Sequence, residues 1–249
     1  MKNRKELLFF YKNPEDESIS RILATKINLP FRGQWESGKS DSNKPMNGYA
    51  FIYSKEGSYI QPILNRKVKP FLCDFNHMES KLVRTNLSRS FKGLAKSSQV
   101  LDATGGLGKD SLEMAMYFEE VIVAEKVPWL HLLLSEGLSK QLKKDFTLTN
   151  KIKLFLINSE ELLKKKSFDL IYLDPMFGLL NKRSDSKKGI QLLKDCVPEE
   201  PVTTLFDLAL NSARDRVVVK RHRKSEYISK TKPNYSIKSK LIRFDVYKP

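Results

Sequence analysis

The stretch that decides the fold is Leu101-Asp-Ala-Thr-Gly-Gly-Leu-Gly-Lys-Asp110, in which a short apolar run ends at Asp102 and a glycine turn follows. Gly105, Gly106 and Gly108 permit positive φ, and they let the backbone pass close to a ligand that a Cβ atom would obstruct. A strand, a glycine turn and a helix in this order are typical of a nucleotide-type ligand seated at a helix N-terminus.

Strands and helices alternate regularly from this stretch onward. The pattern predicts strands at residues 100–103, 121–124, 152–157, 168–173 and 216–219, with helices at 109–118, 128–146, 160–165 and 202–213. Such alternation predicts a Rossmann-like α/β fold, with a mostly parallel sheet and ligands at the carboxyl ends of its strands. Residues 235–238 and 241–247 predict an antiparallel C-terminal hairpin at the edge of that sheet.

The N-terminal part of the chain is predicted to be a separate lobe. Residues 1–78 lack the strand-helix rhythm, and they predict short strands at 49–53 and 59–64 joined by turns. Residues 79–96 predict a basic helix that covers the edge of the ligand site. We therefore expect a small lobe over residues 1–78 and a larger catalytic domain over 79–249.

The charge of the chain indicates a polyanionic partner. Its formal net charge is +16, and residues 214–249 hold twelve Lys and Arg against three Asp and Glu. This clustering favours nucleic acid over a membrane surface or a merely soluble basic protein. No stretch approaches the roughly 18 consecutive apolar residues of a membrane helix, and the two cysteines have no metal-ligand spacing. The sequence therefore predicts a cytoplasmic protein without a metal site.

A second motif, Asp174-Pro-Met-Phe177, follows the strand predicted at residues 168–173. It offers a carboxylate, the Pro175 carbonyl and the Phe177 ring, a set that suits a planar base bearing an exocyclic amine. Glu125 stands twenty positions after Gly105, where a carboxylate can accept hydrogen bonds from both hydroxyls of a ribose. Together the two motifs predict transfer of a methyl group from S-adenosylmethionine to such an amine, with Asp174, Pro175 and Phe177 as the catalytic set.

Other interpretations of the same residues remain open. The glycine loop alone is a weak signal, and an NAD-dependent dehydrogenase is disfavoured because Ser111 occupies the third glycine position of the dinucleotide pattern. The acceptor amine could belong to adenine or cytosine in another nucleic acid. A catalytically inactive RNA-binding protein of the same fold is the alternative from a different class.

The motifs resemble those of the ribosomal RNA small subunit methyltransferase J family. The resemblance rests on residues 101–110, 172–177, 216–221 and 243–247, and it spans residues 74–249. It implies a class I S-adenosylmethionine-dependent enzyme that methylates N2 of a guanosine near the 3′ end of 16S ribosomal RNA. Besides Asp102, Gly105, Gly106 and Gly108, it implies cofactor contacts by Lys109, Asp110, Glu125, Lys126, Asn158, Ser159 and Asp174.

This chain departs from the family pattern at a few of these positions. The family has Arg where Lys109 and Lys126 stand, and Ser-Ser where this chain has Asn158-Ser159. Lysine keeps the charge of arginine but lacks its planar fork.

Basic residues in the loop after Phe177 and after the strand predicted at 216–219 are predicted to hold the RNA. A stacked guanine hides its amine, so the enzyme must flip the base or meet it already unstacked, at a cost of a few kcal/mol that phosphate contacts can offset. The candidates are Lys182, Arg183, Lys187, Lys188, Lys220, Arg221, Arg223 and Lys224.

Overall fold

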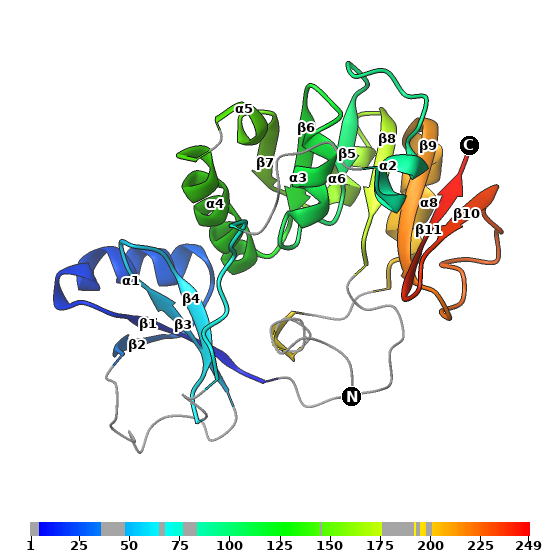
Figure 1. Cartoon of the computed structure of the whole chain (residues 1–249). Helices are drawn as coiled ribbons and strands as arrows, with labels where there is room; N and C mark the ends of the chain where they lie inside the picture. The colour runs from blue at the N-terminus through cyan, green and yellow to red at the C-terminus, as the bar shows by residue number, and fades with distance from the viewer. Residues whose placement is uncertain are drawn as a thin grey trace. The chain divides into compact units, whose positions relative to one another are not determined.

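The computed structural model describes residues 5–35, 48–64, 68–76, 84–144, 146–175, 192, 195–197 and 201–249. The chain divides into two compact units (Figure 1). One comprises residues 1–74, 127–137 and 185–198, and the other comprises 75–126, 138–184 and 199–249. Within the described ranges, no helix is both long enough and apolar enough to cross a membrane.

The first unit is built on a sheet in the order β2-β1-β3-β4. Its strands are β1 (Leu7–Tyr11), β2 (Phe31–Gln34), β3 (Tyr49–Tyr53) and β4 (Tyr59–Pro62), and η1 (Pro14–Asp16) and α1 (Glu17–Lys26) connect β1 to β2. The predicted strands at 49–53 and 59–64 are confirmed. However, β1 pairs in parallel with both β2 and β3, so the lobe does begin with a strand-helix-strand unit, contrary to the expectation from the sequence.

The reason is that β1 is buried along its whole length. A strand covered on both faces shows a continuous apolar run instead of an alternating pattern. Leu8 and Phe10 pack in the cluster around Trp35, whereas the Phe9 ring stacks on Phe51 with 5.5 Å between centroids. Residues 127–137 join this unit through Glu136, whose carboxylate accepts hydrogen bonds from the Ser58 backbone N–H and hydroxyl at 2.6 and 2.8 Å.

The second unit contains a seven-stranded sheet in the order β10-β11-β9-β8-β5-β6-β7. Its strands are β5 (Val100–Asp102), β6 (Val121–Glu125), β7 (Ile152–Leu156), β8 (Phe168–Leu173), β9 (Ala213–His222), β10 (Tyr235–Lys238) and β11 (Ile242–Tyr247). The strands from β5 to β9 pair in parallel, while β11 pairs antiparallel with β9 and β10. This confirms the predicted mostly parallel sheet with its C-terminal hairpin.

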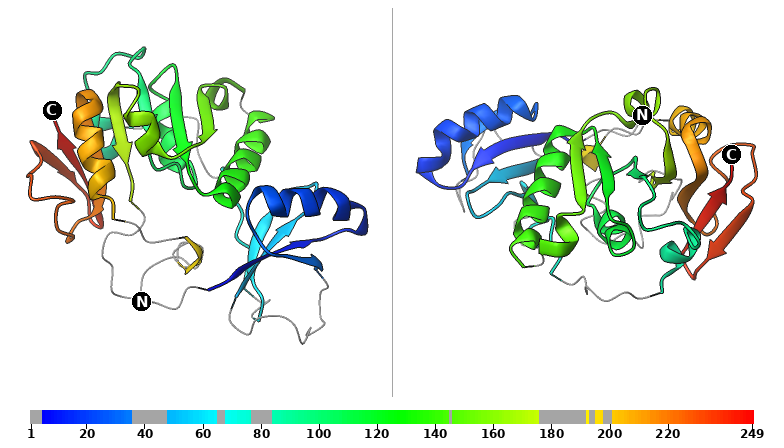
Figure 2. Two further views of the ribbon diagram at one scale, coloured as in Figure 1. Left: turned by 180° about the vertical axis from the view of Figure 1, so that it is seen from behind. Right: turned by 90° about the horizontal axis from the view of Figure 1, so that it is seen from above.

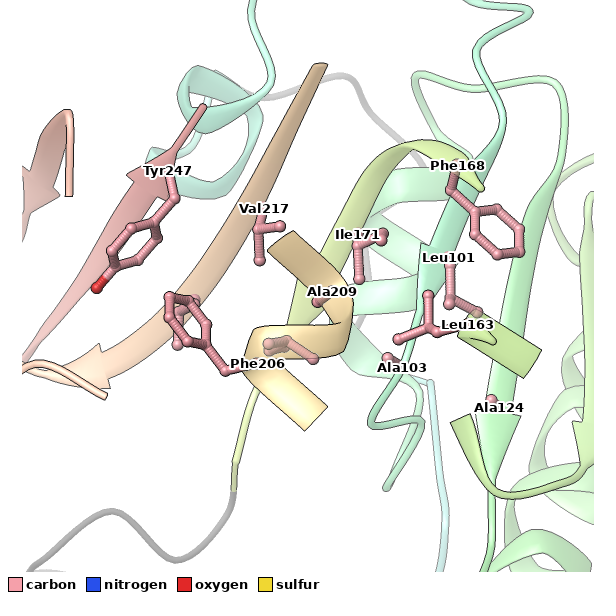
Figure 3. Packing of buried hydrophobic residues seen from close by; sticks show 12 residues of the cluster. Leu101, Ala103, Ala124, Leu163, Phe168, Ile171, Phe206, Ala209, Val217 and Tyr247 are labelled. Carbon is pink, nitrogen blue, oxygen red and sulfur yellow. The ribbon is translucent and has the colours of Figure 1, made fainter. Parts of the chain in front are cut away.

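Helices cover both faces of this sheet (Figure 2). On one face lie α2 (Asn86–Ser90) and α3 (Lys109–Ala115), and on the other lie α6 (Ser159–Leu163) and α8 (Thr203–Ser212). The core beneath α6 and α8 is formed by Leu101, Ile171, Val217, Phe206 and Tyr247 with their neighbours (Figure 3). Because alternate residues of a strand face opposite sides, Asp102, Tyr172 and Lys220 are directed to the α3 face.

Several helices are shorter than predicted, including the one expected at 109–118, which is observed as α3 and ends at Ala115. Of the helix expected at 79–96, residues 79–83 lie outside the described ranges, and within 84–96 the structure contains α2. A capping box between Thr85 and Ser88 starts α2, Phe91 ends it, and Gly93 beyond has φ +93°. The helix expected at 128–146 is observed as α4 (Pro128–Leu142), and α5 (Phe146–Thr149) follows separately. Conversely, β9 extends the expected strand 216–219 at both ends.

Candidate active site

The glycine loop connects the carboxyl end of β5 to α3. The Gly105 N–H donates to the Ala124 carbonyl at 3.0 Å, and a Cβ atom on Gly105 would lie 2.8 Å from Val123 Cγ1. Gly106 and Gly108 adopt φ +54° and +68° in the left-handed region, and Gly108 is the N-cap of α3. Gly105 is therefore required because the loop passes close to β6, whereas glycine is favoured at 106 and 108 because these residues have positive φ.

Two buried carboxylates fix this loop. The Glu125 side chain, at the end of β6, accepts a hydrogen bond from the Gly106 N–H at 2.8 Å. Asp102 accepts from the Thr104 N–H at 3.0 Å and from the Ser111 hydroxyl. Burial raises the pKa of Asp102 to about 7, although these hydrogen bonds act in the opposite direction. The loop is thus held by groups that the protein itself supplies.

The remaining predicted cofactor residues surround the same sheet edge. The Asn158 side chain caps α6 by accepting from the Glu160 N–H at 3.0 Å, and the buried Ser159 hydroxyl donates to the Ala103 carbonyl. Lys109 and Lys126 are exposed, at the start of α3 and directly after β6. The carboxyl ends of β5, β6 and β7 therefore bring all of these positions together, as the parallel arrangement predicts.

Asp174 follows β8 and belongs to a network of charged groups. The Lys220 ammonium, on β9, donates to Asp174 Oδ2 at 2.9 Å and to Asp110 Oδ2 at 2.7 Å. The Tyr172 hydroxyl donates to the same Asp110 oxygen at 2.6 Å. The register of β8 and β9 explains why Lys220 pairs with Asp174. Leu173 lies opposite Val219, so the residues that follow them, Asp174 and Lys220, are also neighbours. One cation thus bridges the second motif to the first turn of α3.

A further hydrogen bond links the two motifs directly. The Asp174 backbone N–H donates to Thr104 Oγ1 at 2.7 Å, so a side chain of the glycine loop holds the start of the Asp-Pro turn. Pro175, partly exposed, is the last described residue before the gap at 176–191. Phe177, the third member of the predicted catalytic set, lies outside the described residues.

The network sets the protonation of its members. Burial raises the pKa of Asp174 to about 6, and the adjacent Lys220 ammonium counteracts this rise. Burial disfavours the charged form of Lys220, but the Asp174 and Asp110 carboxylates outweigh burial and raise its pKa. Burial, followed by the nearby carboxylates, also raises the pKa of Tyr172 well above its ordinary value. At neutral pH, Asp174 is therefore predominantly a carboxylate beside a permanently charged lysine.

The structure changes the expectation for two of the basic residues grouped as RNA contacts. Lys220 extends into the site and pairs with two carboxylates instead of lying on the surface. Arg221 is only 9% exposed, and its guanidinium donates to the Glu226 carbonyl at 3.2 Å. Arg223 and Lys224 are exposed as expected. Lys182, Arg183, Lys187 and Lys188 lie outside the described residues.

The sequence contained a signal for the position of Lys220. It directly follows three valines of a buried strand, and it stands two residues after Val218, which is fully buried. A residue at this spacing faces the same side of the sheet as Val218, inside the domain and under α3. A lysine that continues such a strand is more consistent with a paired site residue than with a surface contact.

Comparisons with known proteins agree with this geometry. Residues 55–249 match the SAM_MT family model of SAM-dependent methyltransferases. A solved SAM-dependent methyltransferase from Neisseria gonorrhoeae shares the fold, with a TM-score of 0.67 and 22% identity over 97% of this chain and 96% of the other. The fold, the site and the family model define an S-adenosylmethionine-dependent methyltransferase.

Two curated relatives identify the particular family, and both are named ribosomal RNA small subunit methyltransferase J. The relative from Francisella tularensis is 31% identical over 193 residues, which cover 72% of this chain and 80% of the relative. The relative from Alcanivorax borkumensis is 34% identical over 171 residues, with coverage of 66% and 68%. The chain therefore belongs to the ribosomal RNA small subunit methyltransferase J family, which confirms the resemblance found in the sequence.

Proposed function

We propose that this enzyme transfers a methyl group from S-adenosylmethionine to the exocyclic N2 of a guanosine near the 3′ end of 16S ribosomal RNA, in the cytoplasm. The observation that carries the proposal is the Asp174 carboxylate at the carboxyl end of β8, held by Lys220 and bonded through its backbone to the glycine loop. The names of the relatives support ribosomal RNA of the small subunit as the substrate. Residues 79–249 form the proposed catalytic domain, with residues 1–78 as an accessory lobe.

The residues present fit S-adenosylmethionine. Asp102, Gly105, Gly106 and Gly108 shape the loop, and Glu125 provides a carboxylate for ribose hydroxyls at the end of the neighbouring strand. The other proposed contacts are Lys109, Asp110, Lys126, Asn158, Ser159 and Asp174. When bound, the cofactor supplies an electrophilic methyl group on a sulfonium.

The chain's own residues act on the acceptor base. The lone pair of a guanine amine is delocalised into the ring, so the amine is a weak nucleophile and positioning supplies most of the acceleration. Asp174 and the Pro175 carbonyl accept hydrogen bonds from the amine, and Phe177 stacks on the base. Lys220 donates to Oδ2 of Asp174, and we assign Oδ1 as the oxygen that accepts from the amine. The proton released after transfer passes to Asp174 or to water, because a carboxyl whose pKa is about 6 is a weak but competent base.

The test is transfer of labelled methyl from S-adenosylmethionine to 30S subunits that lack the modification, followed by mapping of the product nucleoside. We expect N2-methylguanosine from the native enzyme and none from Asp174→Ala. Asp169→Ala is the matched control, because Asp169 lies near the start of the same strand in a surface ion pair with Arg214. A methylated adenine or cytosine, or equal transfer by Asp174→Ala, would contradict the assigned acceptor or the assigned role.

The cofactor contacts are tested separately by calorimetric titration with S-adenosylmethionine. Glu125→Gln removes a charged acceptor of the Gly106 N–H, so we expect Kd to rise by about tenfold, as for loss of a charge-assisted hydrogen bond. Glu161→Gln, at an exposed position of α6, serves as the control and should keep the native Kd. Equal affinities of the two variants would exclude Glu125 from the cofactor site.

A further inference from the structure

The C-terminal hairpin ends beside the active site. We call residues 222–226 and 238–242 the hairpin tip. Ile242 lies opposite His222 at the end of β9, and the Arg223 N–H donates to the Leu241 carbonyl at 2.9 Å. The turn between β10 and β11 is closed by the Ser239 N–H, which donates to the Ile242 carbonyl at 2.8 Å. Because Lys220 lies on the same strand two residues before His222, the tip lies at the same sheet edge as Asp174.

The hairpin tip concentrates positive charge. Four of its cations are exposed, namely Arg223, Lys224, Lys238 and Lys240. Among the residues that the structure describes, none of these four side chains forms an ion pair. Glu226 is the one exposed acidic residue of the tip. Charges that the protein leaves unpaired on one small surface are available to a polyanion.

A buried ion pair gives this surface a fixed shape. Arg243 is 4% exposed, and its Nε donates to both carboxylate oxygens of Asp245, which is fully buried, at 2.9 Å. The rest of its guanidinium donates to the carbonyls of His222, Arg223, Ser225 and Glu226 at 2.7 to 3.3 Å. The buried Arg243 therefore fixes the backbone around Arg223 and Lys224 through these hydrogen bonds.

We infer that the hairpin tip is a preorganised binding surface for the RNA phosphate backbone next to the target nucleotide, with Lys224, Lys238 and Lys240 contacting phosphates and Arg243 as the positioning residue. The inference rests on the proposed function. Its first support is location, since the tip and Asp174 lie at the same edge of the sheet. Its second support is rigidity, because a surface ordered in advance loses less entropy when it binds.

Two variants with equal charge test the inference. The tip variant carries Lys224→Gln, Lys238→Gln and Lys240→Gln. The control variant carries Lys230→Gln, Lys232→Gln and Lys248→Gln, three exposed lysines of the same C-terminal segment outside the tip. Both lose three positive charges, so they differ in the place of the charge and not in its amount. Binding to unmodified 30S subunits and to naked 16S ribosomal RNA is measured over a range of salt concentrations, together with kcat and KM.

We expect the tip variant to bind more weakly, with the slope of log affinity against log salt reduced in magnitude by about 2 to 3. Its KM should rise while kcat and the affinity for S-adenosylmethionine stay native, because the tip lysines do not contact Asp174 or the glycine loop. The control variant should keep the native slope and KM.

Each other result has a defined meaning. Equal losses in both variants would overturn the inference, because bulk charge would then account for binding. A loss on 30S subunits but not on naked RNA would also overturn it, in favour of an acidic ribosomal protein as the partner. If the native enzyme methylates 30S subunits and the tip variant is unchanged, the tip inference fails alone. If the native enzyme methylates neither substrate, the proposed function fails.

Discussion

Replacing Lys220 by methionine tests how the site keeps its acceptor carboxylate ionised. Methionine fills a similar volume and carries no charge, so the change removes the cation that bridges Asp174 and Asp110. Two carboxylates then remain close together in a partly buried site with no cation between them. Both effects favour protonation of Asp174.

The magnitude follows from the pKa of Asp174, which is about 6 in the presence of Lys220. An opposite charge at this distance lowers a carboxyl pKa by about 1 to 3. The Asp174 side chain is 33% exposed and solvent screens the pair, so the lower half of that range applies. The acid limb of kcat should therefore move from a midpoint near 6 to one about 1 to 2 pH units higher.

The sign of the effect follows from the proposed role of Asp174 as an acceptor. A protonated carboxyl is a poorer acceptor for the amine than the ionised carboxylate, so kcat rises as pH increases through the pKa of this group. At pH 7, we expect Lys220→Met to be slower by about twofold to tenfold, with recovery near pH 9.

The assay is kcat against pH at saturating S-adenosylmethionine and RNA, because kcat reports groups of the bound complex. Lys220→Arg is the control, since it keeps a cation and should keep a midpoint near 6. A methionine variant with an unchanged midpoint, at whatever rate, would refute the claim that Lys220 controls the ionisation of Asp174.

Further predictions concern the frame of the site. Gly105→Ala places a methyl group 2.8 Å from Val123 Cγ1, so the free energy of unfolding in urea should fall by about 1 to 3 kcal/mol; an unchanged value would contradict the close packing. Asp245→Asn leaves Arg243 buried without its counter-ion and should cost about 3 to 5 kcal/mol in the same assay, and a loss below 1 kcal/mol would show that the carbonyls suffice. Burial raises the pKa of Asp102 to about 7, so the stabilisation from its bound proton is complete below about pH 4, where the unfolded chain is also protonated, and is lost as pH rises through 7. Native stability should therefore decrease relative to Asp102→Asn between pH 4 and pH 8, whereas parallel pH curves would show that Asp102 has an ordinary pKa.

Much of the catalytic fold could be predicted because its elements are local and alternate regularly. The strand at 168–173 and the strands of the hairpin were placed within a residue or so of their observed bounds. In contrast, β1 was missed because a strand buried on both faces has no period-two pattern to detect. The length of α2 depends on a capping box at Thr85, which a hydrophobic pattern does not reveal.

The sequence predicts those site residues that lie at or just after the carboxyl ends of the strands. Asp102, Glu125 and Asp174 were assigned from their positions after buried strands, and the structure brings them to one sheet edge. The roles of Lys220 and Arg243 required knowledge of register, because each acts on residues far away in sequence. The positive charge of Lys220 predicted a phosphate contact, whereas the structure pairs this lysine with the partly buried Asp110 and Asp174 carboxylates.

Thr104 links the two motifs of the site. Its backbone N–H is bonded to Asp102 within the glycine loop, and its hydroxyl accepts the N–H of Asp174. A change in the conformation of the glycine loop is therefore transmitted to Asp174, the residue proposed to contact the base. The glycine loop and the Asp-Pro turn are therefore coupled, so a substitution at Thr104 should weaken cofactor binding and the positioning of Asp174 together.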